Sequence, residues 1–117
     1  MAIPQKFREA LSQEFSCFYE VSEQPSSWDD WLENELEEES SIGAARLRYW
    51  IDDRDIAELV EFLRTQSEER NGELVREIEN WTNSFWSHDD RKWKALQQIL
   101  TSIADQLEAL AENRASQ

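Results

Sequence analysis

The side chains of this 117-residue chain that could do chemistry are mostly carboxylates, and they are concentrated in one segment. No Lys or Arg occurs between Arg8 and Arg46, yet that stretch contains eleven Asp and Glu residues. Seven of them fall within one short run: Asp29, Asp30, Glu33, Glu35, Glu37, Glu38 and Glu39. Carboxylates at this density could attract a cationic partner, hold a divalent metal ion, or act as a general acid and base.

Metal binding is disfavoured by the pattern of the available ligands. The window from Asp29 to Ser40 lacks the mid-loop glycine and the alternating ligands of an EF-hand. Cys17 and His88 are the sole cysteine and histidine, so a zinc site of the Cys/His type would lack ligands. No Glu stands three residues before His88, as a di-iron site in a helical bundle would require. We therefore expect no metal and no cofactor.

Catalysis is disfavoured as well. Cys17 and His88 could form a nucleophile and its base, but Cys17 lies beside a predicted buried stripe, where a thiol usually only packs. The segment Ser87–Asp90 falls between two predicted helices, where Ser and Asp normally act as helix caps. With only two glycines, the chain has no phosphate-binding loop and no nucleophile elbow. We expect the protein not to be an enzyme.

The acidic segment also contains two large apolar side chains, Trp28 and Trp31. It thus combines long-range electrostatic attraction with groups that can anchor a contact. The sequence predicts a small acidic protein-binding module of the inhibitor, immunity, adaptor or assembly-factor type, which recognises a basic surface on a partner protein. Its predicted binding residues are Trp28, Asp29, Asp30, Trp31, Glu33, Glu35, Glu37, Glu38 and Glu39. The simpler interpretation is a solvated acidic face with the two tryptophans in the core.

Two other functions remain open at this point. A row of carboxylates along an exposed ridge could mimic the phosphates of a DNA duplex and block a nucleic-acid-binding protein. Alternatively, the protein could be a structural subunit that forms a homodimer through its last helix. The dimer seam would consist of residues spaced 3 and 4 apart, as in a coiled-coil heptad: Trp93, Leu96, Leu100, Ile103, Leu107 and Leu110. Packing of this helix within its own bundle is the simpler interpretation of the same pattern.

The overall charge restricts the class of partner. The formal net charge is −14 and the pI is near 4.3, so direct binding to nucleic acid or to an anionic membrane would work against strong repulsion. No stretch approaches the length of about 20 apolar residues that a membrane span needs, and the N-terminus lacks the apolar region of a signal peptide. A single cysteine fits a reducing environment, so we expect a cytoplasmic protein.

The elements that must position these residues are helices. The chain contains two Gly and two Pro, few β-branched residues, and much Glu, Leu, Ala, Arg and Gln. This composition predicts an all-α fold: a single domain, residues 1–117, built as an antiparallel bundle of about five to six helices with a long heptad-patterned helix at the C-terminus. Helical spacing predicts the following buried positions: Phe7, Leu11, Phe15 and Phe18; Ile56, Leu59, Val60 and Leu63; Leu74, Ile78, Trp81 and Phe85.

Several helix ends can also be predicted. Ser26 or Ser27 should begin the acidic helix with a capping box, and the glutamates at its C-terminal half should make it end near Ser40. Residues 22–41 could be mobile until a partner binds. Gly72 should take a left-handed cap. The last helix should run from Asp89 to about Glu112, followed by a disordered tail at 113–117.

One further contact patch is predicted near the start of the last helix. Arg91, Lys92 and Lys94 form a small basic cluster, and Trp86 falls one residue off the preceding apolar line. We expect Trp86 to be partly exposed beside this cluster.

Overall fold

Helices form almost all of the computed structural model, which describes residues 3–16 and 28–115. The α-helices in these two ranges are α1 (Gln5–Ser16), α3 (Trp28–Asn34), α4 (Leu36–Trp50), α5 (Ile56–Gln66), α6 (Glu73–Thr82) and α7 (Asp90–Ala115). Two short 3₁₀ turns, η1 (Asp53–Asp55) and η2 (Trp86–His88), connect them. No strand occurs in the described ranges, and the predicted all-α bundle is confirmed.

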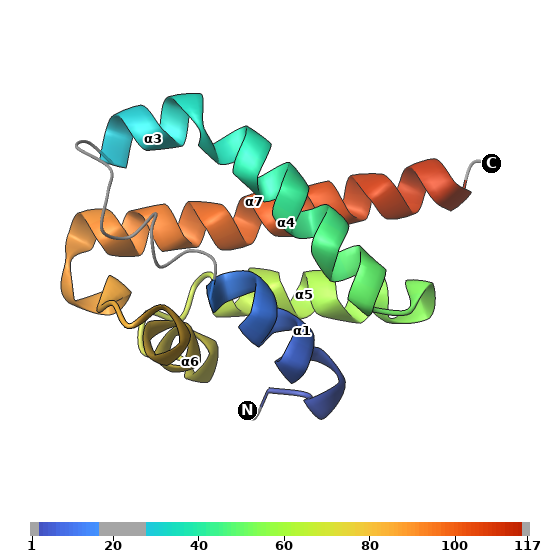
Figure 1. Cartoon of the computed structure of the whole chain (residues 1–117), viewed down its shortest axis with the longest axis horizontal. Helices are drawn as coiled ribbons and strands as arrows, with labels where there is room; N and C mark the ends of the chain where they lie inside the picture. The colour runs from blue at the N-terminus through green and yellow to red at the C-terminus, as the bar shows by residue number, and fades with distance from the viewer. Residues whose placement is uncertain (1–2, 17–27, 116–117) are drawn as a thin grey trace.

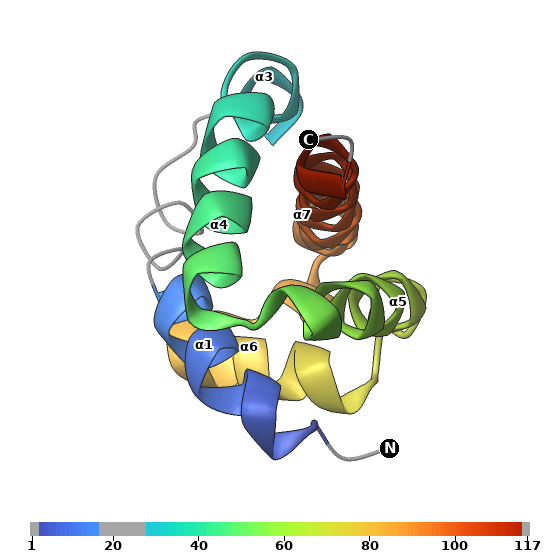
Figure 2. The same ribbon diagram turned by 90° about the vertical axis from the view of Figure 1, so that its right-hand side faces the viewer.

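The long helix α7 is the axis on which the other helices pack. Helix α5 lies beside α7 and runs antiparallel to it, while α4 crosses α7 obliquely on another side (Figures 1 and 2). Helices α1 and α6 pack against each other and close the end of the bundle away from α3. The core therefore lies mainly between α7 and its two neighbours, α4 and α5.

The heptad stripe of α7 lies inside the chain's own core. Its buried members are Trp93, Leu96, Leu100, Ile103 and Leu107, and Leu110 is partly buried against the same core. Helices α4 and α5 of the same chain cover this stripe, so it cannot also be a dimer seam in this conformation. The strict 3,4 spacing of apolar residues in α7 therefore reflects packing within one bundle.

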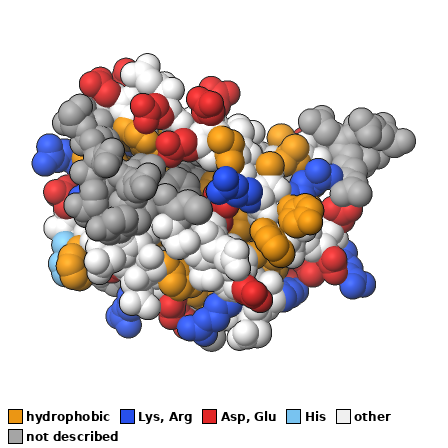
Figure 3. Space-filling view, viewed as in Figure 1, with side chains coloured by type: hydrophobic (Ala, Val, Ile, Leu, Met, Phe, Trp, Pro, Cys, Tyr) orange, Lys and Arg blue, Asp and Glu red, His pale blue; other side chains and the backbone are white. Residues whose placement is uncertain are grey.

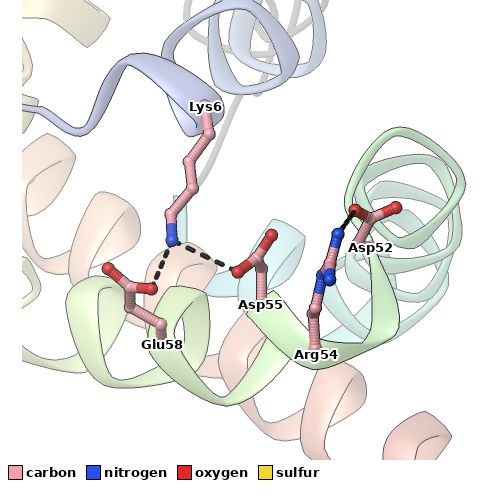
Figure 4. Close-up of polar contacts among 5 residues, drawn as sticks. All are labelled: Lys6, Asp52, Arg54, Asp55 and Glu58. Atoms are coloured by element: carbon pink, nitrogen blue, oxygen red, sulfur yellow. Dashed lines mark hydrogen bonds and ion pairs between the residues drawn. The ribbon is translucent and has the colours of Figure 1, made fainter.

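Ion pairs at the rim connect neighbouring helices. Lys6 of α1 donates to Asp55 at 3.2 Å and also to Glu58 of α5, as Figure 4 shows, whereas the contact of Arg54 with Asp52 is local to the η1 turn. Arg64 of α5 donates to Asp105 and Glu108 of α7 at 2.8 and 3.0 Å. These ion pairs lie at the surface, where solvent screens them, so each adds little stability and the apolar core dominates.

The acidic helix does not end near Ser40, and this prediction was wrong. The chain bends at Glu35, whose φ of −119° departs from helical geometry, and α4 then continues without a break to Trp50. Helical hydrogen bonds span the bend, from Glu35 N to the Trp31 carbonyl at 2.9 Å and from Glu39 N to the Glu35 carbonyl at 3.1 Å. The glutamates 37–39 therefore lie in the first turn of α4, where the helix dipole favours negative charge.

Small residues let α4 approach its neighbours closely. Ser40, Gly43 and Ala44 form the middle of its buried face. A Cβ atom added at Gly43 would lie 3.0 Å from an Oε atom of Glu14 in α1 and 3.5 Å from Cδ1 of Ile103 in α7. Glu14 is itself buried, and desolvation raises the pKa of its carboxyl, an effect that the positive charge of Arg46 only partly offsets. Gly43 thus makes room for a buried acid.

Gly72 plays a different part from the predicted one. Its φ is −71°, so it does not take a left-handed cap, and it precedes α6 as the N-cap residue. A Cβ atom at this position would lie 2.8 Å from Oε1 of Gln66 and 2.9 Å from Cβ of Glu69. The turn therefore needs glycine because other atoms approach it closely.

The end of α6 also differs from the prediction. The helix stops at Thr82, and Asn83 takes the left-handed conformation (φ 54°, ψ 40°), with a hydrogen bond from Ser84 N to the Glu79 carbonyl closing the end. This turn exposes Phe85, which is 66% accessible, and buries Trp86 completely. The indole Nε1 of Trp86 donates to Oγ1 of Thr82 at 2.9 Å. The predictions for both aromatic residues were therefore wrong.

The remaining predictions for the chain hold, miss a helix end by a few residues, or lie outside the described residues. Asp89 caps α7, since its carboxylate accepts from the backbone N of Arg91 at 2.8 Å, and this hydrogen bond and that of Lys92 N lower the Asp89 pKa. Helix α7 extends to Ala115, beyond the predicted end. The predictions for Phe18, Cys17, the capping serines 26 and 27, and residues 22–27 fall outside the described ranges.

The first prediction concerns the two neighbouring aromatics after α6. Trp86→Ala should lower the free energy of unfolding by about 3–5 kcal/mol, because it empties a fully buried site. Phe85→Ala, the matched control, should change it by less than about 0.5 kcal/mol. Urea titration followed by circular dichroism measures both. Similar losses in the two variants would contradict this account of the turn.

The second prediction concerns the contact of Gly43 with Glu14. Alanine in a helix interior is favoured over glycine by about 1 kcal/mol, but here its Cβ would press on the buried carboxyl. Gly43→Ala should therefore fail to stabilise the wild-type chain, yet stabilise the Glu14→Ala variant by about 1 kcal/mol. A double-mutant cycle in urea measures the coupling. An equal effect in both backgrounds would exclude the steric contact.

Candidate protein-binding surface

The predicted acidic residues share one surface formed by α3 and the start of α4. Six of the seven are exposed, and Glu39 is half-buried. In the space-filling view, acidic side chains gather over α3 and the first turn of α4 (Figure 3). We call the exposed set the acidic surface; its members are Asp29, Asp30, Glu33, Glu35, Glu37 and Glu38.

Most of the acidic surface has no ion-pair partner within residues 3–16 and 28–115. The ion pairs of the described residues lie at other helix boundaries, and Asp29, Glu33, Glu35, Glu37 and Glu38 take part in none of them. Lys6, Arg8, Arg64 and Arg70 are paired with acids elsewhere, so they do not compensate the negative field over α3 and the first turn of α4.

The pKa of Glu39 is affected by this concentration of negative charge. Burial raises the pKa of its carboxyl above the usual 4.5, and the nearby negative charges of Glu35 and Glu38 raise it further. A cationic group that approached α4 would favour the ionised form of Glu39. The acidic surface is thus chemically suited to attract positive charge.

The two tryptophans do not stand on this surface as anchors. Trp31 is 4% exposed and belongs to the core, and Trp28 is partly buried against it. Their rings meet edge to face with centroids 6.1 Å apart, and Trp28 also contacts the ring of Trp86 at 5.6 Å. The prediction that Trp31 anchors a partner is therefore corrected: both indoles hold α3 onto the bundle.

A different set of large apolar side chains is exposed nearby, on the C-terminal half of α4. Tyr49 is 82% exposed, Trp50 60% and Ile42 48%, and the rings of Tyr49 and Trp50 meet edge to face at 5.2 Å. The sequence analysis did not predict their exposure. The signal was present: Leu36, Ala44 and Leu47 form the buried line of one continuous helix, which places Tyr49 on the opposite side.

The remaining candidate features are weaker. Arg91 and Lys94 are exposed at the start of α7, but Lys92 is half-buried and donates to Oγ of Ser84 at 3.3 Å, and the buried Trp86 adds no apolar contact to this cluster. In residues 3–16 and 28–115, no group of three His, Cys, Asp or Glu side chains could hold a metal ion. None of the helices in these ranges combines the length and apolar character needed to cross a membrane.

Two shallow grooves lie away from the acidic surface. The first, between α1 and α5, is lined by Pro4, Phe7, Glu58, Glu61, Phe62, Thr65 and Gln66. The second, between α5 and α7, is lined by Asp53, Ile56, Ala57, Val60, Glu108, Ala111 and Glu112. Neither contains a residue of the predicted site.

The raised pKa of Glu39 predicts a pH dependence of stability. A carboxyl whose pKa is raised by folding favours the native state below pH 4.5, and that contribution is lost as the pH rises through the folded-state pKa. Glu39→Gln should therefore raise Tm at neutral pH and leave it nearly unchanged in acid. Thermal unfolding across this pH range measures the effect, with Glu68→Gln as an exposed control. A lower Tm for Glu39→Gln at neutral pH would contradict it.

Comparison with known proteins adds no assignment. No family model matches the chain, and neither the curated proteins nor the solved structures contain a match to it.

Proposed function

We propose that this protein is a small, non-enzymatic binding module that recognises a basic surface on a partner protein through the outer face of α3 and α4. The observation that supports the proposal best is the acidic surface itself: six exposed carboxylates on two consecutive helices, most of them without an ion pair in the described chain. Such a field accelerates encounter with an oppositely charged surface and selects against acidic ones.

The position of the charges supports a binding role over a purely solvating one. Acids that only keep a protein soluble need not cluster, and mixed signs serve that purpose well. Here like charges lie on adjacent helical turns, where repulsion between residues i and i+4 destabilises the helix by about 0.2–0.5 kcal/mol per pair. A cationic partner relieves this repulsion when it binds. The absence of phosphate-binding loops from the sequence and the net charge of −14 favour a protein partner over a nucleotide or a nucleic acid.

The test is association kinetics with a partner purified by capture from a nuclease-treated native lysate. Glu35→Lys/Glu37→Lys/Glu38→Lys should slow association at least about tenfold and flatten its dependence on ionic strength, because these residues supply the steering field. Glu9→Lys/Glu68→Lys/Glu69→Lys is the matched control: it changes the net charge equally at exposed positions elsewhere and should leave most of the association rate intact.

Equal association rates for the two charge-reversed variants would show that only total charge matters and would refute a localised surface. Competition with duplex DNA for the captured partner distinguishes the DNA-mimic alternative from recognition of a protein surface alone. If duplex DNA displaces the protein from its captured partner, the acidic surface occupies a nucleic-acid-binding site on that partner. If it does not, the partner's basic surface serves protein recognition alone.

A further inference from the structure

The exposed apolar residues of α4 continue the acidic surface along one line of the helix. Glu35, just before α4, and Glu38, Ile42, Ala45 and Tyr49 within it are separated by 3, 4, 3 and 4 residues, and all five are exposed. This is the spacing of a heptad seam. The line lies opposite the buried face of α4, which contains Leu36, Ser40, Gly43, Ala44 and Leu47. We call these five exposed residues the outer stripe.

The outer stripe has the form of half a helix–helix contact. It spans about 21 Å, at a rise of about 1.5 Å per residue, which matches roughly four turns of a partner helix. Ala45 is small and stands between the larger Ile42 and Tyr49, leaving a low point suited to a leucine-sized side chain. Trp50 packs against Tyr49 at the end of the line and widens the apolar area. In Figure 3 hydrophobic side chains gather over this half of α4.

The charges along α4 define the chemistry and direction of the occupant. The N-terminal end of the stripe is acidic and adjoins the carboxylates of α3, whereas the half-buried Arg48 lies in the same half of the helix as Tyr49. A complementary helix therefore carries Lys or Arg opposite Glu35 and Glu38, and apolar residues opposite Ile42 and Tyr49. Reversing such a helix would bring its basic end toward Arg48.

A second copy of this chain fits the stripe poorly. Each copy brings a net charge of −14, and pairing through α4 would bring two acidic surfaces together. Arg46 is also the cation that offsets the buried Glu14 of its own chain, so it is not freely available to a neighbouring copy.

We propose that the outer stripe is a docking site for a basic amphipathic helix of the partner protein, oriented by its charge gradient. This inference rests on the proposed function and deepens it: the acidic surface accelerates encounter, and Ile42, Ala45, Tyr49 and Trp50 form the apolar contact that holds the complex. In protein interfaces most of the affinity resides in a few large anchors, which are often aromatic.

The test uses synthetic, dye-labelled helical peptides of about 21 residues, long enough to cover the stripe. Two of the peptides carry residues at heptad spacing that are Lys or Arg in one half and Leu in the other. In one peptide the basic half is N-terminal, and in the other it is C-terminal. A third has the same composition in scrambled order. Fluorescence anisotropy should show both oriented peptides binding at least tenfold tighter than the scrambled peptide, because each can dock, parallel or antiparallel to α4, with its basic half beside Glu35 and Glu38.

Variants of the protein then separate the two proposals. Ile42→Ser/Tyr49→Ser should weaken binding of the oriented peptides at least tenfold, while Phe85→Ser, which changes another exposed aromatic, should leave it within twofold. Glu35→Lys/Glu38→Lys should weaken it as well, and Glu68→Lys/Glu69→Lys much less. Circular dichroism checks that each variant remains helical.

Four results would overturn the docking site. Equal binding of the scrambled and oriented peptides would reduce the interaction to net charge. If Glu35→Lys/Glu38→Lys weakens binding but Ile42→Ser/Tyr49→Ser does not, the acidic surface stands and the apolar stripe fails. If neither double variant weakens binding of the peptide, both the acidic surface and the apolar stripe fail as binding sites. Concentration-dependent dimerisation of the wild type, lost in Ile42→Ser/Tyr49→Ser, would assign the stripe to a second copy.

Discussion

The close packing of α4 against α1 and α7 is the constraint on which the rest of the structure depends. It is made by small residues, Ser40, Gly43 and Ala44, so the helix approaches its neighbours with little side-chain volume between them. A helix held this way has room for large apolar groups only at the ends of its buried face. Tyr49 lies on the opposite side of the helix and remains outside, and Glu38 of the first turn extends the same outer line. The candidate binding surface is in this sense a consequence of the core.

Much of the fold could be predicted from apolar spacing. The buried positions of α5 and α7 follow the 3,4 pattern, and Asp89 could be predicted as a cap because Asp commonly fills that position. The predictions that were wrong concern helix ends and the burial of single residues, which tertiary contacts decide. Trp86 enters the core because Asn83 turns the chain, and Asn is a known alternative to glycine in the left-handed region. The pattern alone extended α6 to Phe85 and so exchanged the two aromatics.

The candidate site was predicted in part. The carboxylates could be recognised because charge density is visible in a sequence, but their place on the helix could not, since it depends on where α4 begins. The bend at Glu35 moved the glutamates 37–39 from the predicted C-terminal end to an N-terminal turn and changed the sign of their interaction with the helix dipole. The aromatic anchors were misassigned for a related reason. Sequence shows which residues are large, whereas packing on both sides of a helix decides which are exposed.

The way in which α3 is attached to the bundle has a further consequence. This seven-residue helix buries a single residue, Trp31, and gains further apolar contact through Trp28 and its ring contact with Trp86. So short a helix is not stable by itself in water, so it depends on the apolar contacts of Trp28, Trp31 and Leu32 and on its hydrogen-bonded junction with α4. Its backbone amides should consequently exchange with solvent through local opening, at a lower free energy than those of α5 or α7. Half of the acidic surface is thereby carried by the least firmly held helix described in the chain.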